Sequence, residues 1–122
     1  MTKKEYNTQC TNLIENGQVN YDMLMQAYAV LDKQVSRYAY LKSKWANERI
    51  SGQGYAEDFT NAIQKRNAVE RILKSEFHIS TEDIKSEIKK KNDNNNVLLT
   101  IKNCDNLVEL IKSNSFKIVI DI

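Results

Sequence analysis

The sequence contains no proline and only three glycines, Gly17, Gly52 and Gly54, among its 122 residues. Proline and glycine are the residues that most often interrupt helices, so long helices fit between these few positions. A chain of this length forms one domain, or one domain with a small annex, which excludes a two-domain enzyme with a separate cofactor fold. The composition therefore predicts a mainly α-helical protein.

Soft metal ligands are equally scarce. The chain has one histidine, His78, and two cysteines, Cys10 and Cys104, whereas a structural zinc site needs four ligands in close pairs. We expect no metal and no cofactor, and we interpret both cysteines as free thiols in a reducing cytoplasm. None of the three side chains has the sequence neighbours that would make it catalytic, so the sequence favours a protein that is not an enzyme.

Charge and hydrophobicity are both unremarkable in amount. Lys and Arg number 18 against 16 Asp and Glu, which leaves a formal charge of only +2 and does not by itself indicate an anionic partner. No apolar run approaches the roughly 20 residues needed to cross a bilayer, so no membrane partner is expected. The pattern of residues therefore has to carry the functional argument.

The most regular pattern lies in residues 21–48, where apolar side chains recur every three or four positions and predict one long helix. Its seam is close to a heptad repeat and stays apolar until Lys42. A helix of about 28 residues would be ~42 Å long, which is more than the core of a small domain covers. We therefore expect a homo-oligomer in which copies pack along this seam, through Leu24, Tyr28, Leu31, Val35, Tyr38 and Trp45.

Further helices surround this one. Residues 50–54 carry two glycines and predict the tip of a helical hairpin, whose second helix covers residues 56–77 with an interruption at Arg66. A short helix over residues 3–15 precedes the hairpin, and Ser80 and Thr81 start a fourth helix. The expected fold is thus mainly α, built on a long antiparallel helical hairpin.

The end of the chain changes in character. A polar tract at residues 92–96 is interpreted as a linker between a helical core, residues 1–91, and an annex, residues 97–122. Residues 97–101 and 116–122 predict strands, and Asp105 is expected to open a short helix that ends at Lys112. This β-α-β annex is too small to stand alone, so it must dock on the hairpin or add its strands to those of neighbouring copies.

Basic residues on the two long helices are the candidates for DNA contact. On the third helix they form a broken ridge, although Asp58 and Glu70 offset part of the charge and make a solvated face an equal alternative. On the second helix they alternate with tyrosines, of which Tyr40 lies off the seam and is able to stack on bases. The candidates are Lys65, Arg66, Arg71 and Lys74, followed by Arg37, Lys42 and Lys44. A further cluster, residues 85 and 89–91, is interpreted as a solvated helix end, with phosphate contact as the alternative.

Several short segments occur in a recognisable order. Residues 13–17 read Leu-Ile-Glu-Asn-Gly and are followed by Tyr21-Asp22 and Tyr28-Ala29. After the glycine-bearing tip come Arg66-Asn67-Ala68, Ile72-Leu73 and Glu76-Phe77-His78-Ile79-Ser80. Over about residues 10–84 this order resembles the phage terminase small subunit family. In that family a short helix ends near Gly, an Asp opens a long helix with a Tyr-Ala step, and a second helix closes on a segment like Phe-Gly-Leu-Thr-Pro.

The resemblance implies a non-enzymatic component of viral genome packaging in the cytoplasm of the host cell. Such proteins form rings of subunits around a helical-hairpin core, bind double-stranded viral DNA, and hand it to the large terminase subunit, which has the ATPase and nuclease activities. The alternative hypothesis is a small phage or mobile-element protein that binds and inhibits a host protein through its helical faces. The dependence of DNA affinity on salt separates the two.

Overall fold

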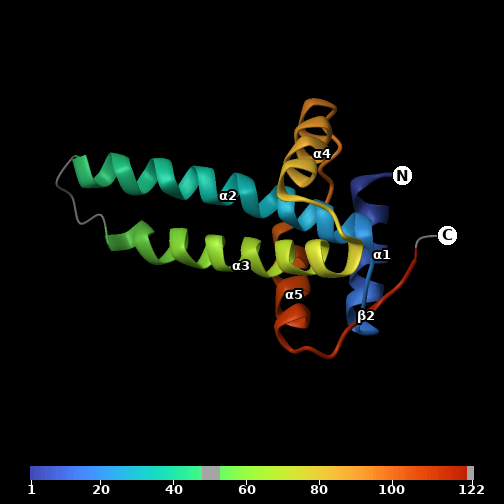
Figure 1. Cartoon of the computed structure of the whole chain (residues 1–122). Coiled ribbons are helices and arrows are strands. Elements are labelled where there is room, and N and C mark those ends of the chain that lie inside the picture. The colour runs from blue at the N-terminus through green and yellow to red at the C-terminus, as the bar shows by residue number, and fades with distance from the viewer. Residues whose placement is uncertain (48–52, 121–122) are drawn as a thin grey trace.

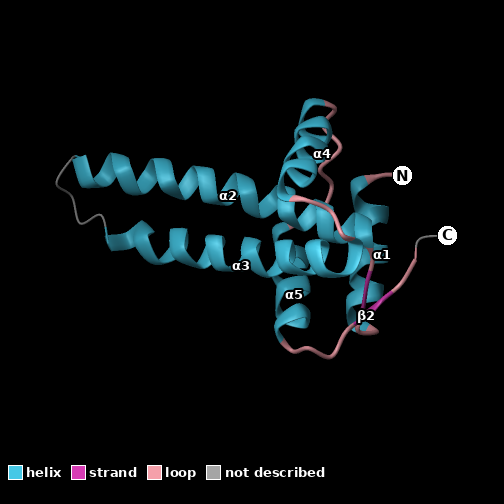
Figure 2. Cartoon of the chain, viewed as in Figure 1, coloured by secondary structure: helices cyan, strands magenta, loops and turns pink. Residues whose placement is uncertain are grey.

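The structure is a computed structural model that describes residues 1–47 and 53–120. Five helices and two short strands follow one another in this part of the chain (Figures 1 and 2). In chain order they are α1 (Lys3–Glu15), β1 (Gln18–Val19), α2 (Tyr21–Asn47), α3 (Gln53–Phe77), α4 (Thr81–Asp93), α5 (Ile101–Lys112) and β2 (Lys117–Ile118). The predicted mainly helical fold is confirmed.

Helices α2 and α3 form the predicted antiparallel hairpin and lie side by side along their length (Figure 1). One half of the hairpin projects as an arm beyond the other elements, and α1, α4, α5 and the strands gather around the opposite half (Figure 1). The predicted tip at residues 50–54 falls largely outside the described residues, and α3 already begins at Gln53. The fold therefore has a packed base and a two-helix arm.

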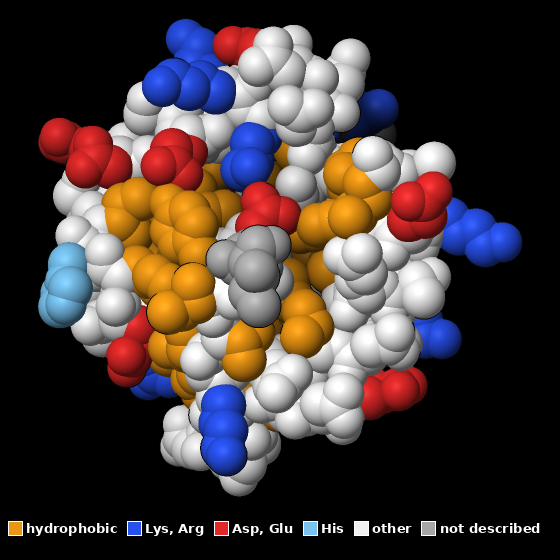
Figure 3. All heavy atoms as spheres, turned by 90° about the vertical axis from the view of Figure 1, so that its right-hand side faces the viewer, with side chains coloured by type: hydrophobic (Ala, Val, Ile, Leu, Met, Phe, Trp, Pro, Cys, Tyr) orange, Lys and Arg blue, Asp and Glu red, His pale blue; other side chains and the backbone are white. Residues whose placement is uncertain are grey.

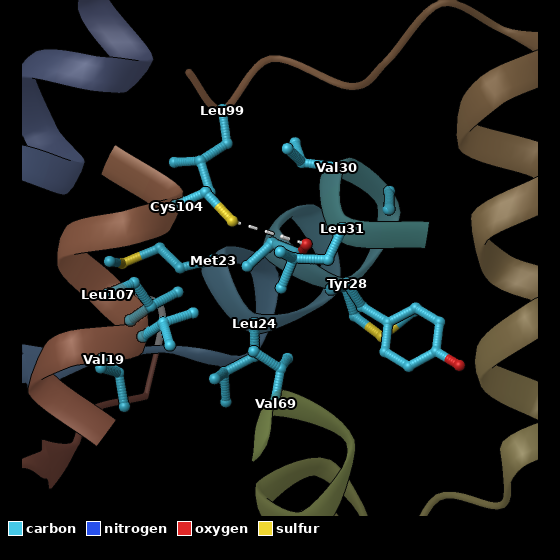
Figure 4. Packing of buried hydrophobic residues seen from close by; sticks show 14 of the residues in the cluster. Val19, Met23, Leu24, Tyr28, Val30, Leu31, Val69, Leu99, Cys104 and Leu107 are labelled. Carbon is cyan, nitrogen blue, oxygen red and sulfur yellow. Dashed lines mark hydrogen bonds between the residues drawn. The ribbon is translucent and has the colours of Figure 1, made fainter. Parts of the chain in front are cut away.

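The core lies in the base, where α2 is surrounded on several sides. Leu31 of α2, Leu73 of α3, Ile84 of α4 and Leu107 of α5 all have 0% exposed surface. Figure 4 shows Leu31 and Leu107 among the packed side chains of this core. Cys104 of α5 is also buried, and its thiol donates to the carbonyl oxygen of Ala27 at 3.8 Å (Figure 4). Since these residues come from both sides of the polar tract 92–96, the described part of the predicted annex, residues 97–120, docks on the hairpin within the same chain, which is one of the two arrangements expected.

The predicted oligomerisation seam of α2 is partly buried within the chain itself. Leu24, Tyr28 and Leu31, three of the six predicted seam residues, are buried in the chain's own core, and α3 runs beside the whole of α2. The premise that α2 needs a second copy to cover it is thereby corrected, because α3 and the base supply that cover. Val35 and Tyr38 are half-buried on the arm, where Tyr38 packs on Tyr55 with 6.3 Å between ring centroids. The side chain of Trp45 lies outside the described residues.

The segment before α5 is not the strand that its β-branched residues predicted. Residues 97–100 form no ladder, and α5 begins at Ile101 with Thr100 as its N-cap, four residues earlier than the start predicted at Asp105. Side chains from distant helices take the place of a partner strand: the Gln26 amide oxygen accepts from the backbone N–H groups of Leu98 and Leu99, at 2.7 and 3.2 Å. The Gln26 side chain thus accepts hydrogen bonds from two backbone N–H groups that would otherwise need a neighbouring strand as their partner.

The two strands that do form lie far apart in the sequence. Strands β1 and β2 pair in parallel, with Gln18 opposite Lys117 and Val19 opposite Ile118. The Lys117 N–H donates a hydrogen bond to the Gly17 carbonyl oxygen at 2.8 Å. Gly17 itself has a left-handed backbone (φ +69°), which glycine adopts more readily than other residues. The prediction that the C-terminal strand pairs with another strand is confirmed for Lys117–Ile118. At this end of the molecule hydrophobic side chains gather on the surface (Figure 3).

Candidate nucleic-acid interface

Two of the basic residues predicted on α3 are engaged in holding the helices together. The Lys65 Nζ lies 3.2 Å from Oδ1 of Asp105 on α5, and the Arg66 Nη1 lies 2.8 Å from Oδ1 of Asp32 on α2. Both pairs are partly buried, so their charges are neutralised within the chain. The interruption of the apolar stripe at Arg66 thus marks an ion pair across the hairpin.

The other two basic residues of that ridge differ from each other. Lys74 pairs with Glu70 one turn away, at 3.4 Å, and the Glu70 carboxylate also accepts a 2.6 Å hydrogen bond from the Thr81 hydroxyl. That hydrogen bond, followed by the interaction with Lys74, lowers the pKa of Glu70, so this carboxylate stays ionised at neutral pH. Arg71 is exposed and forms no ion pair with any described residue. The predicted α3 ridge therefore keeps one available cation.

The basic residues predicted on α2 remain more accessible. Arg37 and Lys44 are exposed, and neither forms an ion pair within the described residues. Lys42 is also exposed, but its Nζ lies 5.2 Å from the centre of the Phe59 ring, a cation–π contact that joins the arm's two helices. Arg37 and Lys44 are thus better placed than Lys42 to meet an anionic ligand.

A further exposed cation extends this surface. Lys33 lies four residues before Arg37, and Tyr40 and Lys44 follow at seven and eleven residues, so all four side chains share one face of α2. This face is roughly 16 Å long at 1.5 Å per residue. Tyr40 is 64% exposed between two cations. The spacing of three and four residues was readable in the sequence, but Lys33 was not among the predicted residues.

The base of the molecule adds three lysines that no sequence pattern connects. A shallow groove of about 710 Å³ runs along α1 beside the first half of α5, and Lys3, Lys4 and Lys102 line it near the two helix starts. Asn7 holds the two helix starts together: its side chain donates to the Leu98 carbonyl at 2.9 Å and accepts from the Thr100 N–H at 2.9 Å. Both helices begin here, so their N-terminal ends add partial positive charge to that of the lysines.

A second hollow, of about 460 Å³, connects the groove to the α2 face. Lys3 and Thr100 line both the groove and this hollow, and Lys33 and Arg37 of the α2 face line the hollow. Glu15 is the one acidic residue among those that line the two hollows. The result is a basic surface assembled from three helices, which we name the basic stripe. It consists of Lys3, Lys4, Lys33, Arg37, Lys44 and Lys102.

Other kinds of site find less support in the described part of the chain. No group of three His, Cys, Asp or Glu residues there is placed to hold a metal ion. Burial, and then the charge of Asp105, raise the pKa of the Cys104 thiol to about 12, so this thiol is protonated at neutral pH. Among the described helices, none combines the length and the apolar character that crossing a bilayer requires.

Comparison with known proteins adds no name to this arrangement. No protein-family model, no curated protein and no solved structure matches the chain. The basic stripe, the hairpin that carries part of it, and the order of segments in the sequence are therefore the features that bear on function.

Proposed function

We propose that the chain is a DNA-binding assembly protein of the phage packaging type, equivalent to the small subunit of a terminase. One observation carries the proposal: five cations from α1, α2 and α5 line two adjoining hollows, and Lys44 continues their surface along α2, although the chain has a net charge of only +2. Cations concentrated in this way displace counterions from a DNA backbone, which is the main source of affinity for DNA. The segment order that resembles the terminase small subunits gives the same reading.

In this proposal the protein is not an enzyme and works as a homo-oligomer in the cytoplasm of the host cell. One stripe neutralises few phosphates and binds duplex weakly, whereas a ring repeats the stripe in every subunit and multiplies the contacts on one DNA molecule. Among the seam residues whose side chains are described, Val35 and Tyr38, half-buried on the arm, are those left for contact between copies. Double-stranded DNA and the large terminase subunit, which supplies ATPase and nuclease activity, are the partners.

A second candidate, a protein that binds and inhibits a host protein, is favoured by a different feature. Hydrophobic side chains gather on the end of the molecule opposite the arm (Figure 3), and Ile120 is 90% exposed. Exposed apolar surface of this kind is typical of protein–protein contact sites. Here the partner would be a protein, and the basic stripe would contribute little.

DNA affinity as a function of salt concentration distinguishes the two candidates. The full-length chain is titrated into labelled duplex at several salt concentrations while its mass is measured by light scattering. A packaging protein gives an oligomeric mass and a steep loss of affinity with salt, with a slope of about −0.9 for each phosphate contacted. A monomer with weak DNA affinity and a slope near zero would contradict the proposal and support the inhibitor.

A further inference from the structure

The hollow that joins the groove to the α2 face has an apolar floor and a basic rim. Its floor comes from the middle of α2 and from the segment that leads into α5. Its rim carries cations from two helices, together with the amide of Gln34. The floor residues are Val30, Val97, Leu99 and Ile101, and the basic residues are Lys3, Lys33 and Arg37.

Two of the floor residues belong to the core, while a third does not. Val30 and Leu99 are 8% and 4% exposed, so they present fixed apolar surface at the bottom of the hollow. Ile101 is 57% exposed at the first position of α5, where Thr100 already provides the cap. An aliphatic side chain left open to water beside three cations does little for stability. The exposed Ile101 side chain beside these cations complements a ligand that has a flat apolar face next to a negatively charged group.

A nucleotide has this combination, because each base has two apolar faces and its phosphates are charged. We infer that this hollow takes an unpaired base of a DNA strand whose phosphates follow the basic stripe. Lys3, Lys33 and Arg37 neutralise the phosphates on either side of the base, and the Gln34 amide offers a donor and an acceptor to the base edge. The inference rests on the proposed function and adds to it a preference for DNA with a single-stranded end.

The extent of the basic surface favours a nucleic acid over other anions. A fatty acid or a single carboxylate needs one cation, whereas the α2 face continues from Lys33 to Lys44 over roughly 16 Å. Tyr40 stands on this continuation between Arg37 and Lys44, where its exposed ring is able to stack on a second base. An extended polyanion with aromatic rings therefore complements the surface along its length, and an acidic peptide complements only its charge.

Three DNA probes of matched sequence test the inference with the full-length chain. One is a blunt duplex, the second carries a short single-stranded overhang, and the third carries the same overhang with abasic sugars, which keep the phosphates and remove the bases. We expect the overhang probe to bind about tenfold more tightly than its abasic version, since only an intact base is able to bury its apolar face on the floor of the hollow. The salt slope should be the same for both, because their phosphates are the same.

A pair of variants then locates the effect. Ile101→Ser should reduce the difference between the overhang probe and its abasic version several-fold, leaving only what Tyr40 contributes, whereas Ile120→Ser, which changes another exposed isoleucine, should leave it intact. Equal affinity of the wild-type chain for those two probes would overturn the inference, even if the blunt duplex binds well and the proposed function stands. An Ile101-dependent affinity for a polyglutamate peptide, with no effect of the overhang bases, would also overturn it. Failure of all three probes to bind would contradict the proposed function itself.

Discussion

Arg66 of α3 donates a 2.8 Å hydrogen bond from Nη1 to Oδ1 of Asp32 on α2. The pair lies one residue beyond Leu31, where the buried stretch of α2 ends and the arm begins. Their side chains are 24% and 39% exposed, so water screens the interaction only in part. The pair thus fixes the two helices against each other at the root of the arm.

Arg66→Glu should therefore act on stability and leave DNA binding unchanged. The substitution places two carboxylates together in a partly buried position, and we expect the free energy of unfolding to fall by about 1–3 kcal/mol. Urea unfolding followed by circular dichroism measures this loss. The control is Arg71→Glu, which has no ion pair and should change stability by less than about 0.5 kcal/mol. A lower DNA affinity for folded Arg66→Glu would show that the guanidinium reaches DNA after all.

Neutralising Lys33 and Arg37 should weaken DNA binding without changing the fold. Both side chains are exposed and line the second hollow. Each is expected to contribute one phosphate contact, so the double variant Lys33→Gln/Arg37→Gln should reduce the steepness of the salt dependence by about 2. The matched control removes two cations from outside the stripe, Lys112 and Lys117, by the same substitution. Equal salt slopes for the two double variants would contradict the placement of the interface.

Leu31→Asp should prevent folding. Leu31 has 0% exposed surface in the chain's own core, and an unpaired carboxylate there costs several kcal/mol, which is a large share of the stability of a small domain. Circular dichroism should report loss of helix, and light scattering should find no folded monomer. Val35→Asp, on the arm, is the comparison: it should stay folded and lower the mass if copies meet along this helix. A folded Leu31→Asp chain of reduced mass would mean that Leu31 lies between copies.

Tyr6 provides a prediction about alkaline pH. Its hydroxyl donates a 2.7 Å hydrogen bond to Oδ2 of Asp22, and burial, then this bond and the charge of Asp22, raise its pKa far above 10. The folded chain therefore keeps the proton above pH 10, where an unfolded tyrosine loses it, so the folded state binds more protons and stability falls as pH rises. At pH 7 Tyr6→Phe should be about 1 kcal/mol less stable than wild type.

Above pH 10 that difference should shrink by up to about 1.4 kcal/mol per pH unit, because only the wild-type chain has Tyr6 to ionise. Tyr21, whose pKa burial and Glu87 raise to about 12, and Cys104 are present in both chains and cancel in the comparison. Urea unfolding of both chains at pH 7 and pH 11 measures the change. A difference that stays constant with pH would show that Tyr6 titrates alike in the folded and unfolded states.

The elements that the sequence predicts well are those with local signals. The hairpin follows from apolar residues spaced by three and four, and the fourth helix follows from the Ser80 cap, whose hydroxyl accepts from the Asp83 N–H at 3.1 Å. The strand predicted before α5 is wrong because the side chains that bind its backbone, Gln26 and Asn7, lie 72 to 93 residues away along the chain, so no local pattern indicates them. The basic stripe was likewise predictable only in part. The four-residue spacing of Lys33 and Arg37 places both on one face of a helix, whereas Lys3 and Lys102 lie close together only because α1 packs beside α5.

The hydrogen bonds of Asn7 set an order for folding during synthesis. Helix α1 is synthesised well before its partners at residues 98–103, and β1 well before the β2 strand that pairs with it. The hairpin forms from contacts nearer in sequence and does not have to wait for them, since contacts between distant residues carry the larger closure cost. Lys3 and Lys4 come to lie beside Lys102 only when this final step is complete. A ribosome-bound chain that still lacks those residues therefore carries most of its Lys and Arg residues without the assembled stripe.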